Sequence, residues 1–191
     1  MRLSVTHNFP AVQRKLEQLR KDIASKALVS TLNKVGDQAK TLASKEVREE
    51  FNLKAAVVRE QLRVTRAYAN GRVNIKVELV ARGRGKGRSL GVVEFAAREV
   101  AKGVQIKIRK KGARTLIRNA FIATMPSGHR GVFVRRGKAR LKIDEVYTID
   151  LPQMFNSRRI NKKVLDFMVR KFPEVFEREA AFYLRRFNGS R

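Results

Sequence analysis

Composition and charge limit the classes of protein to which this chain can belong. It has 191 residues, and its 44 lysines and arginines against 17 aspartates and glutamates give a formal net charge of +27. The 43% hydrophobic content is enough for a sizeable core in one domain, which argues against a disordered chain. No cysteine is present, so a disulfide framework, a zinc finger with thiolate ligands and a thiol nucleophile are excluded. The charge favours a polyanionic partner: nucleic acid, an anionic membrane or an acidic protein surface.

The N-terminal part of the chain predicts two amphipathic helices. From residue 9 to residue 23 apolar side chains recur at alternating steps of three and four, and Pro10 suits a first turn. A second stripe, of mostly small residues, runs over 27–43, with Gly36 as its weak point. Small residues on a helix face permit close packing, either within the protomer or against a neighbouring copy.

The next segments predict a third helix and then a strand. Asn52 is a suitable N-cap, and apolar spacing indicates a helix that begins at Leu53 and ends near Asn70 and Gly71. The stretch "RVNIKVELVA" at 72–81 then alternates apolar with polar residues, which is typical of a strand with one buried face.

Later segments predict more strands and one last helix. Extended structure is expected in "GVVEF", "GVQIKIRKKG", "LIRNAFIATM", "GVFVRRGK" and "DEVYTIDLP". Helical spacing returns over 160–187, where Pro173 is expected to kink or interrupt the helix. The apolar stripe of this helix predicts four buried side chains: Phe167, Val175, Phe176 and Leu184.

The order of these segments predicts an α+β fold. We expect a single domain over 1–191, with helices in 1–70, a central and mainly antiparallel β-sheet in 71–155, and a long Pro-interrupted C-terminal helix in 156–191. A basic Gly/Arg hairpin loop at 81–91 is expected to extend from the sheet.

The basic loop is the feature with the clearest functional content. Its sequence, "ARGRGKGRSLG", alternates cations with glycine, and residues 81–119 hold twelve basic and two acidic side chains. Such a segment can meet a phosphate backbone or an acidic partner by charge alone, which gives salt-sensitive and sequence-independent binding. The alternative is a solvated loop that contributes only to solubility. The candidate contact residues are Arg82, Arg84, Lys86, Arg88, Lys107, Arg109, Lys110, Lys111 and Arg114.

Motif spacing argues against several other ligands. A P-loop requires a hydroxyl residue after its Gly-Lys pair, and here Gly85 and Lys86 are followed by Gly87. The glycines do not have dinucleotide-binding spacing either. No zinc-finger, basic-zipper or aromatic RNA-recognition pattern is present. No apolar run approaches the roughly 20 residues that cross a bilayer, and the N-terminus lacks an apolar signal core, so no membrane partner is expected.

Enzyme chemistry is not indicated. His7 precedes the first predicted helix and His129 lies in the predicted turn "PSGHRG", so neither belongs to a metal-ligand set or a catalytic triad. The carboxylates Asp144, Glu145 and Asp150 suit salt bridges in a basic chain as well as they suit a metal-dependent nuclease. We therefore assign no catalytic, metal-binding or cofactor-binding residue, and no small-molecule substrate.

The order of segments resembles the minor tail protein Z family of long-tailed bacteriophages, the tail completion proteins of lambda-like phages. The similar features are the small-residue helix "ALVSTLNKVGDQAKTLASKEV", the basic helix "NLKAAVVREQLRVTRA" and the strand "RVNIKVEL", followed by the Gly/Arg-rich middle. The most specific block runs from Ala120 to Leu151, with "AFI", a turn, a Gly-containing strand and "RRGKAR".

The resemblance implies a non-enzymatic structural protein of the virion, made and assembled in the host cytoplasm and located at the tail end or neck. It implies that the protein completes the tail for head joining, as a hexameric ring around the DNA channel. The implied partners are other copies of the chain, a tail terminator or tail tube protein, head–tail connector proteins, and the DNA backbone without sequence specificity. From the residues alone, the alternative is a sequence-independent nucleic-acid-binding protein outside the virion.

Overall fold

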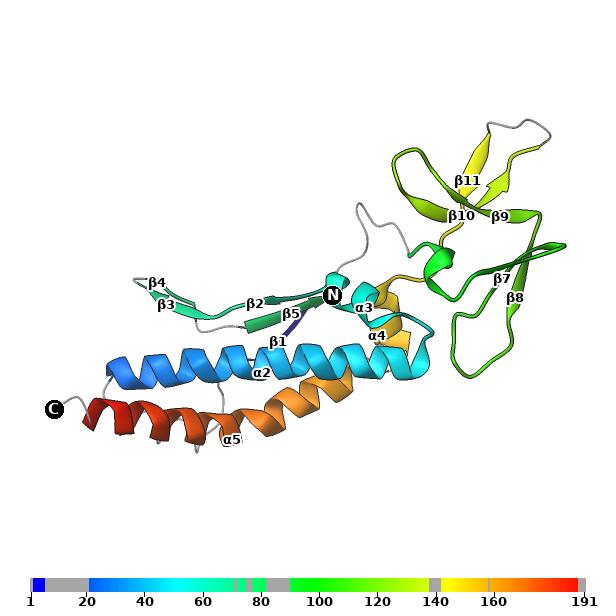
Figure 1. Cartoon of the computed structure of the whole chain (residues 1–191). Coiled ribbons are helices and arrows are strands. Elements are labelled where there is room, and N and C mark those ends of the chain that lie inside the picture. The colour runs from blue at the N-terminus through cyan, green and yellow to red at the C-terminus, as the bar shows by residue number, and fades with distance from the viewer. Residues whose placement is uncertain are drawn as a thin grey trace. The chain divides into compact units, whose positions relative to one another are not determined.

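The computed structural model describes residues 2–5, 21–70, 72–74, 77–81, 90–137, 142–157 and 159–188. Helices and strands follow one another in an α+β order, which confirms the predicted fold class (Figure 1). The helices are α2 (Lys21–Glu50), α3 (Ala55–Gln61), α4 (Leu151–Ser157) and α5 (Ile160–Asn188), with one 3₁₀ helix, η1 (Val92–Glu94). The strands are β1 (Arg2–Val5), β2 (Leu62–Thr65), β3 (Tyr68–Asn70), β4 (Arg72–Asn74), β5 (Val77–Ala81), β6 (Arg98–Val100), β7 (Gly103–Ile106), β8 (Thr115–Arg118), β9 (Ala120–Thr124), β10 (Arg130–Arg135) and β11 (Ile143–Glu145).

The strands pair antiparallel in small sheets. Three sheets have three strands each, in the orders β1-β5-β2, β6-β7-β8 and β11-β10-β9, and β3 pairs with β4 alone. The chain forms two compact units. The first holds Met1–Ala43, Leu62–Ala81 and Arg159–Arg191, and the second holds Ser44–Gln61 and Arg82–Arg158.

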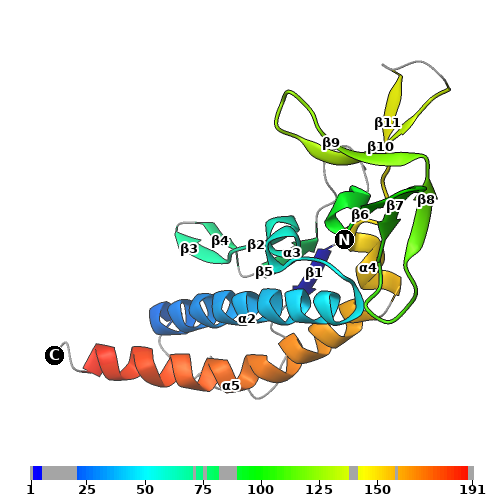
Figure 2. The same ribbon diagram turned by 45° about the vertical axis from the view of Figure 1, so that its right-hand side comes forward.

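In the first unit, α2 and α5 lie side by side in both views (Figures 1 and 2). The small-residue stripe of α2 is buried by the chain itself, since Ala27, Ala39 and Ala43 are fully inaccessible. This face is therefore not available for contact with a neighbouring copy. Phe172 and Phe176 stack on the inner side of α5, with ring centroids 6.4 Å apart.

The long helices partly follow the predicted pattern. Helix α2 is continuous through Gly36, and α5 is continuous through Pro173, so the predicted interruption does not occur. The proline removes the backbone bond to the carbonyl of Val169, and that residue is 42% exposed, so water can replace the lost donor. Val175 and Phe176 are buried as predicted. The prediction was wrong for Leu184, which is 37% exposed, and Phe167 is only partly buried.

The third helix is shorter than predicted because strand pairing replaces it. Helix α3 ends at Gln61, and β2 begins at Leu62 as the antiparallel partner of β5. Within β2 the apolar residues Leu62 and Val64 alternate with polar ones, so the segment satisfies a strand period as well as a helical one. The pairing with β5 decides between the two.

The second unit is built around one apolar cluster shared by two sheets. Val92, Val104, Ile106, Ala120 and Val132 form this core, from η1 and strands β7, β9 and β10.

The "GVVEF" segment was predicted to be extended, and this was wrong. The N–H groups of Glu94 and Phe95 donate to carbonyls three residues back, at 3.2 and 3.1 Å, and so form the 3₁₀ turn that buries Phe95.

Helix α4 was not predicted, although its N-terminus has a recognisable sequence signal. Asp150 accepts a hydrogen bond from the N–H of Gln153 at 2.9 Å, and the Gln153 side chain accepts one from the N–H of Asp150 at 3.1 Å. This reciprocal pair is a capping box with Asp and Gln. Pro152 in the first turn costs no helical hydrogen bond. Leu151, Met154 and Phe155 are buried, so the helix packs one apolar face into the protein.

Candidate functional site

The predicted basic residues divide into two groups. Arg82, Arg84, Lys86 and Arg88 lie outside the described residues. The strands that flank this segment in the sequence, β5 and β6, belong to different sheets, and β5 is already paired on both sides by β1 and β2. The second group lies on the connection between β7 and β8, which is named here the 107–114 segment. Its cations are Lys107, Arg109, Lys110, Lys111 and Arg114.

The first half of the 107–114 segment is held by backbone hydrogen bonds. The N–H of Lys107 donates to the carbonyl of Phe95 at 2.9 Å. The N–H of Lys110 donates to the carbonyl of Glu50 at 3.0 Å, and the carbonyl of Ile108 accepts the N–H of Asn52 at 2.8 Å. Glu50 is the last residue of α2, so Lys110 satisfies a carbonyl at the negative end of that helix.

The second half of the segment is exposed, and it is fixed again at its end. Residues 109–114 are all exposed, and Gly112 has a φ of 150°, in a region that few side chains adopt. The Nη1 of Arg114 then donates to the carbonyl of Ala96 at 3.1 Å. The segment is therefore an exposed basic loop with both ends anchored.

The charges of the 107–114 segment are not neutralised locally. Its eight residues include no acidic side chain, and within the described part of the chain none of its five cations forms an ion pair. Exposed cations of this kind attract phosphate groups or carboxylates at long range without selecting a sequence. A structural role is also present, because the start of the segment closes the C-terminal end of α2.

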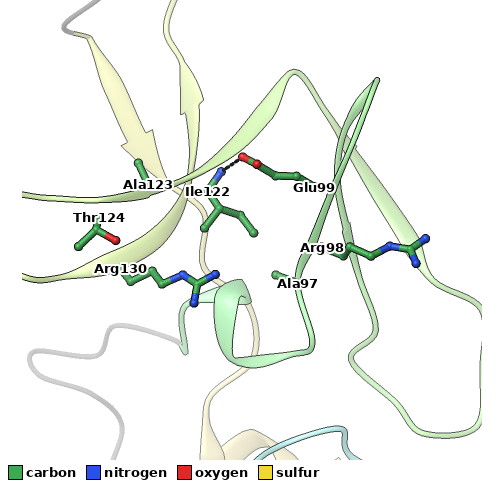
Figure 3. A pocket seen from close by; sticks show the side chains of 7 residues that line it. All are labelled: Ala97, Arg98, Glu99, Ile122, Ala123, Thr124 and Arg130. Atoms are coloured by element: carbon green, nitrogen blue, oxygen red, sulfur yellow. Dashed lines mark hydrogen bonds between the residues drawn. The ribbon is translucent and has the colours of Figure 1, made fainter.

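A second polar feature is a shallow hollow beside β9 (Figure 3). It holds about 590 Å³ and is lined by Ala97, Arg98, Glu99, Ile122, Ala123, Thr124 and Arg130. Glu99 accepts a hydrogen bond from the backbone N–H of Ile122 at 2.7 Å. The sequence alone does not predict this site, because it depends on side chains from strands that become neighbours only in the fold.

A third cluster places His129 next to Glu145. The Nε2 of His129 lies 2.9 Å from Oε1 of Glu145, and the hydroxyl of Tyr147 donates to the other carboxylate oxygen. Two glycines leave room for this carboxylate, since a Cβ at Gly91 or at Gly131 would lie 3.1 or 2.9 Å from Oε1. Glu145 is thus placed to form a salt bridge with His129 whenever the imidazole is protonated, which fits one of the two roles that the sequence left open. The cluster ties the β9–β10 turn to β11.

In the first unit the polar cluster is structural. Glu179, only 3% exposed, accepts hydrogen bonds from Lys34 Nζ at 2.7 Å and from Ser30 Oγ at 2.8 Å. Burial raises the pKa of this carboxyl, but the hydrogen bonds from Lys34 and Ser30 and the nearby positive charges outweigh burial and lower the pKa below its ordinary value. The carboxylate is therefore kept ionised, and its partners are all within the protein.

Among the described residues, no group of three or more histidine, aspartate or glutamate side chains is placed to hold a metal ion. No helix in the described ranges combines the length and apolar character needed to cross a membrane.

Comparison with known proteins gives one match. The sequence model of the Prophage minor tail protein Z (GPZ) family matches residues 10–189, nearly the whole chain. No curated protein and no solved structure is similar at a significant level. The family match confirms the resemblance found in the order of the sequence segments.

Proposed function

Because the chain belongs to the prophage minor tail protein Z family, whose members are structural proteins of the phage tail and not enzymes, we propose that it completes the tail end that joins the head. The family match over residues 10–189 is the observation that carries this proposal. In the proposed role the protein is a virion component at the tail end or neck. Its partners are other tail proteins, including a tail terminator or tail tube protein and the head–tail connector.

The proposed form in the particle is a closed ring around the DNA channel, with six copies to match the sixfold tail. The buried small-residue face of α2 cannot supply the contact between copies. Sheet edges and exposed loops are the remaining surfaces, and β6, β8 and β11 are edge strands within the second unit. Repulsion between chains of charge +27 opposes ring formation in isolation, so we expect the ring to form only against other tail proteins or DNA.

The proposed role of the two basic segments is to contact polyanions. A ring that lines a channel filled with DNA needs positive charge without base recognition. The five cations of the 107–114 segment, without ion pairs among the described residues, fit this need. The residues Arg82, Arg84, Lys86 and Arg88 are proposed to act in the same way, on the phosphate backbone or on an acidic neighbouring protein.

Particle composition tests the proposal. Purified tails are expected to contain the protein at a fixed copy number, six in the proposed ring. Deletion of its coding sequence is expected to leave filled heads and tails of normal length that do not join. The alternative, a free sequence-independent nucleic-acid-binding protein, predicts instead that the protein is absent from purified tails and that head–tail joining proceeds without it.

A further inference from the structure

Strand β9 has one edge that is not paired with another strand. It is the last strand of the sheet β11-β10-β9, so only β10 pairs with it. The N–H of Ile122 points away from β10, because it donates to Glu99. Backbone groups of a strand alternate in direction, so the N–H and carbonyl of Thr124 point the same way. Within the described part of the chain, Thr124 has no hydrogen-bond partner on this edge.

Glu99 occupies the place that the carbonyl of an added strand would take. Its Oε1 accepts the N–H of Ile122 at 2.7 Å, and the side chain is exposed (Figure 3). A side chain that covers one backbone donor protects an edge only partly, because the next outward pair, at Thr124, stays open. The exposed carboxylate can leave Ile122 at little cost when another acceptor arrives.

The hollow beside this edge is lined by apolar and by positively charged side chains. Ala97, Ile122 and Ala123 supply partly buried apolar surface. The guanidinium of Arg130 extends toward the hollow in Figure 3, and this residue has no ion pair among the described residues. Arg98 lies at the rim, but its guanidinium points away in the figure and donates to Gln105 at 3.4 Å.

We propose that the outward edge of β9 accepts an extended, acidic segment of another protein as an added antiparallel strand. The main-chain groups of Thr124, and of Ile122 once Glu99 leaves, supply the ladder hydrogen bonds. An acidic side chain of the added strand meets Arg130, and a small apolar side chain covers Ala97 and Ile122. The charge of +27 selects an acidic partner over a second copy of this chain, because like charges oppose approach.

This inference does not depend on the proposed ring or on DNA in the channel, because it concerns one edge of one protomer. It adds a mode of contact to the tail-protein partnership proposed above. The experiment below uses purified protein and a synthetic peptide, so its result is separate from any result on tail completion.

The test is binding of a fluorescein-labelled eight-residue peptide of alternating valine and aspartate to the full-length protein. The control peptide has the same charge but a central proline, which removes a ladder hydrogen bond. We expect the first peptide to bind and to slow hydrogen exchange at the Thr124 amide, and the proline peptide to bind markedly more weakly. Arg130→Ala should weaken binding about two- to fivefold, as expected for one exposed charge pair. Glu99→Gln should strengthen binding by a similar factor, since it removes a like charge.

Arg98→Ala is the matched control variant, because it removes the same charge one residue from Glu99 but on the side that faces away from the hollow. A smaller loss than for Arg130→Ala supports the proposal. Equal losses for the two variants, or equal binding of the proline peptide, would mean attraction by charge alone and would overturn it. Slowed exchange at Thr124 caused by self-association or by duplex DNA, with no effect of the peptide, would also overturn it in favour of those occupants.

Discussion

Lys34 on α2 and Glu179 on α5 form a partly buried contact across 145 positions of sequence, with Nζ 2.7 Å from Oε1. Ser30, one turn earlier on α2, donates to the other carboxylate oxygen. A carboxylate that is 3% exposed is stable in this position only because these donors replace water. Within the first unit, hydrogen bonds from Lys34 and Ser30 thus join α2 to α5 at Glu179.

The first prediction follows from the lowered pKa of Glu179. A carboxyl whose pKa is lower in the folded than in the unfolded protein adds stability above its ordinary pKa of about 4.3 and loses it as the pH falls through the folded value. The free energy of unfolding should therefore fall below about pH 4.3, and this part of the fall should be absent in Glu179→Gln. Chemical denaturation at several pH values measures it. Glu174→Gln is the comparison on the same helix: Lys171 lowers the pKa of Glu174 as well, but the pair is exposed and screened by solvent, so its share of the fall should be smaller than that of Glu179. An unchanged acid slope in Glu179→Gln contradicts the assignment.

A second prediction concerns Asn33, whose side chain acts as a backbone partner. Its Oδ1 accepts the N–H of Ala67 at 2.9 Å and its Nδ2 donates to the carbonyl of Ala67 at 3.1 Å. These two hydrogen bonds attach the connection between β2 and β3 to α2. Asn33→Ala should lower the free energy of unfolding by about 1–3 kcal/mol, because it leaves the backbone groups of a buried residue unpaired. Thr41→Ala, at an exposed site on α2, should change it by less than about 0.5 kcal/mol. Equal effects would contradict this role of Asn33.

Two phenylalanines on α5 form a matched pair for the third prediction. Phe176 is fully buried and Phe182 is 47% exposed. Phe176→Ala should destabilise the protein by about 3–5 kcal/mol through lost contacts and a cavity, and Phe182→Ala should cost far less. Thermal unfolding followed by circular dichroism compares them. A small effect of Phe176→Ala would mean that the interior of the first unit is loosely packed.

The fourth prediction tests the basic segments against each other. Serine at the four cations of 82–88 should leave the thermal midpoint within about two degrees, because exposed charges away from special features cost less than about 0.5 kcal/mol. If DNA is the partner, the slope of log affinity against log salt should shrink by up to about 0.9 for each lost contact, equally for unrelated duplexes. The matched variant is serine at Arg109, Lys110, Lys111 and Arg114.

Unchanged salt slopes for both variants, with defective head–tail joining, would identify an acidic protein as the partner instead. Unchanged slopes with normal joining would leave the solvated-loop alternative.

The fifth prediction is that residues 1–191 unfold as a single domain. Helix α2 runs from the first unit into the second without a break at Ala43 and Ser44. Because helix formation is cooperative, we expect both units to unfold in one transition, with equal calorimetric and van't Hoff enthalpies. Phe176→Ala in the first unit and Val132→Ala in the second should each shift that single transition. Two separate transitions, each moved by only one variant, would mean two domains.

The elements that could be predicted from the sequence are those in which one hydrophobic periodicity dominates. The elements that could not be predicted depend on pairing with segments distant in the sequence. The long helices and strands β7, β9 and β10 follow from spacing alone. The end of α3 at Gln61 does not, because β2 exists only by pairing with β5. The capping box of Asp150 and Gln153 was available in the sequence and identifies α4. The hollow at β9 was not available, since Glu99 and Arg130 come together only after two sheets have formed.

The first unit is assembled from three separate segments of the chain, the last of them Arg159–Arg191, and this sets an order of events during synthesis. The stripe of α2 from Ala27 to Ala43 leaves the ribosome more than a hundred residues before α5, the helix whose Glu179 it must meet. The segments of the second unit, by contrast, are complete once Arg158 has been made. A nascent chain therefore carries α2 without its partner α5 while the second unit folds, and a truncation within α5 leaves part of α2 exposed to chaperones and proteases.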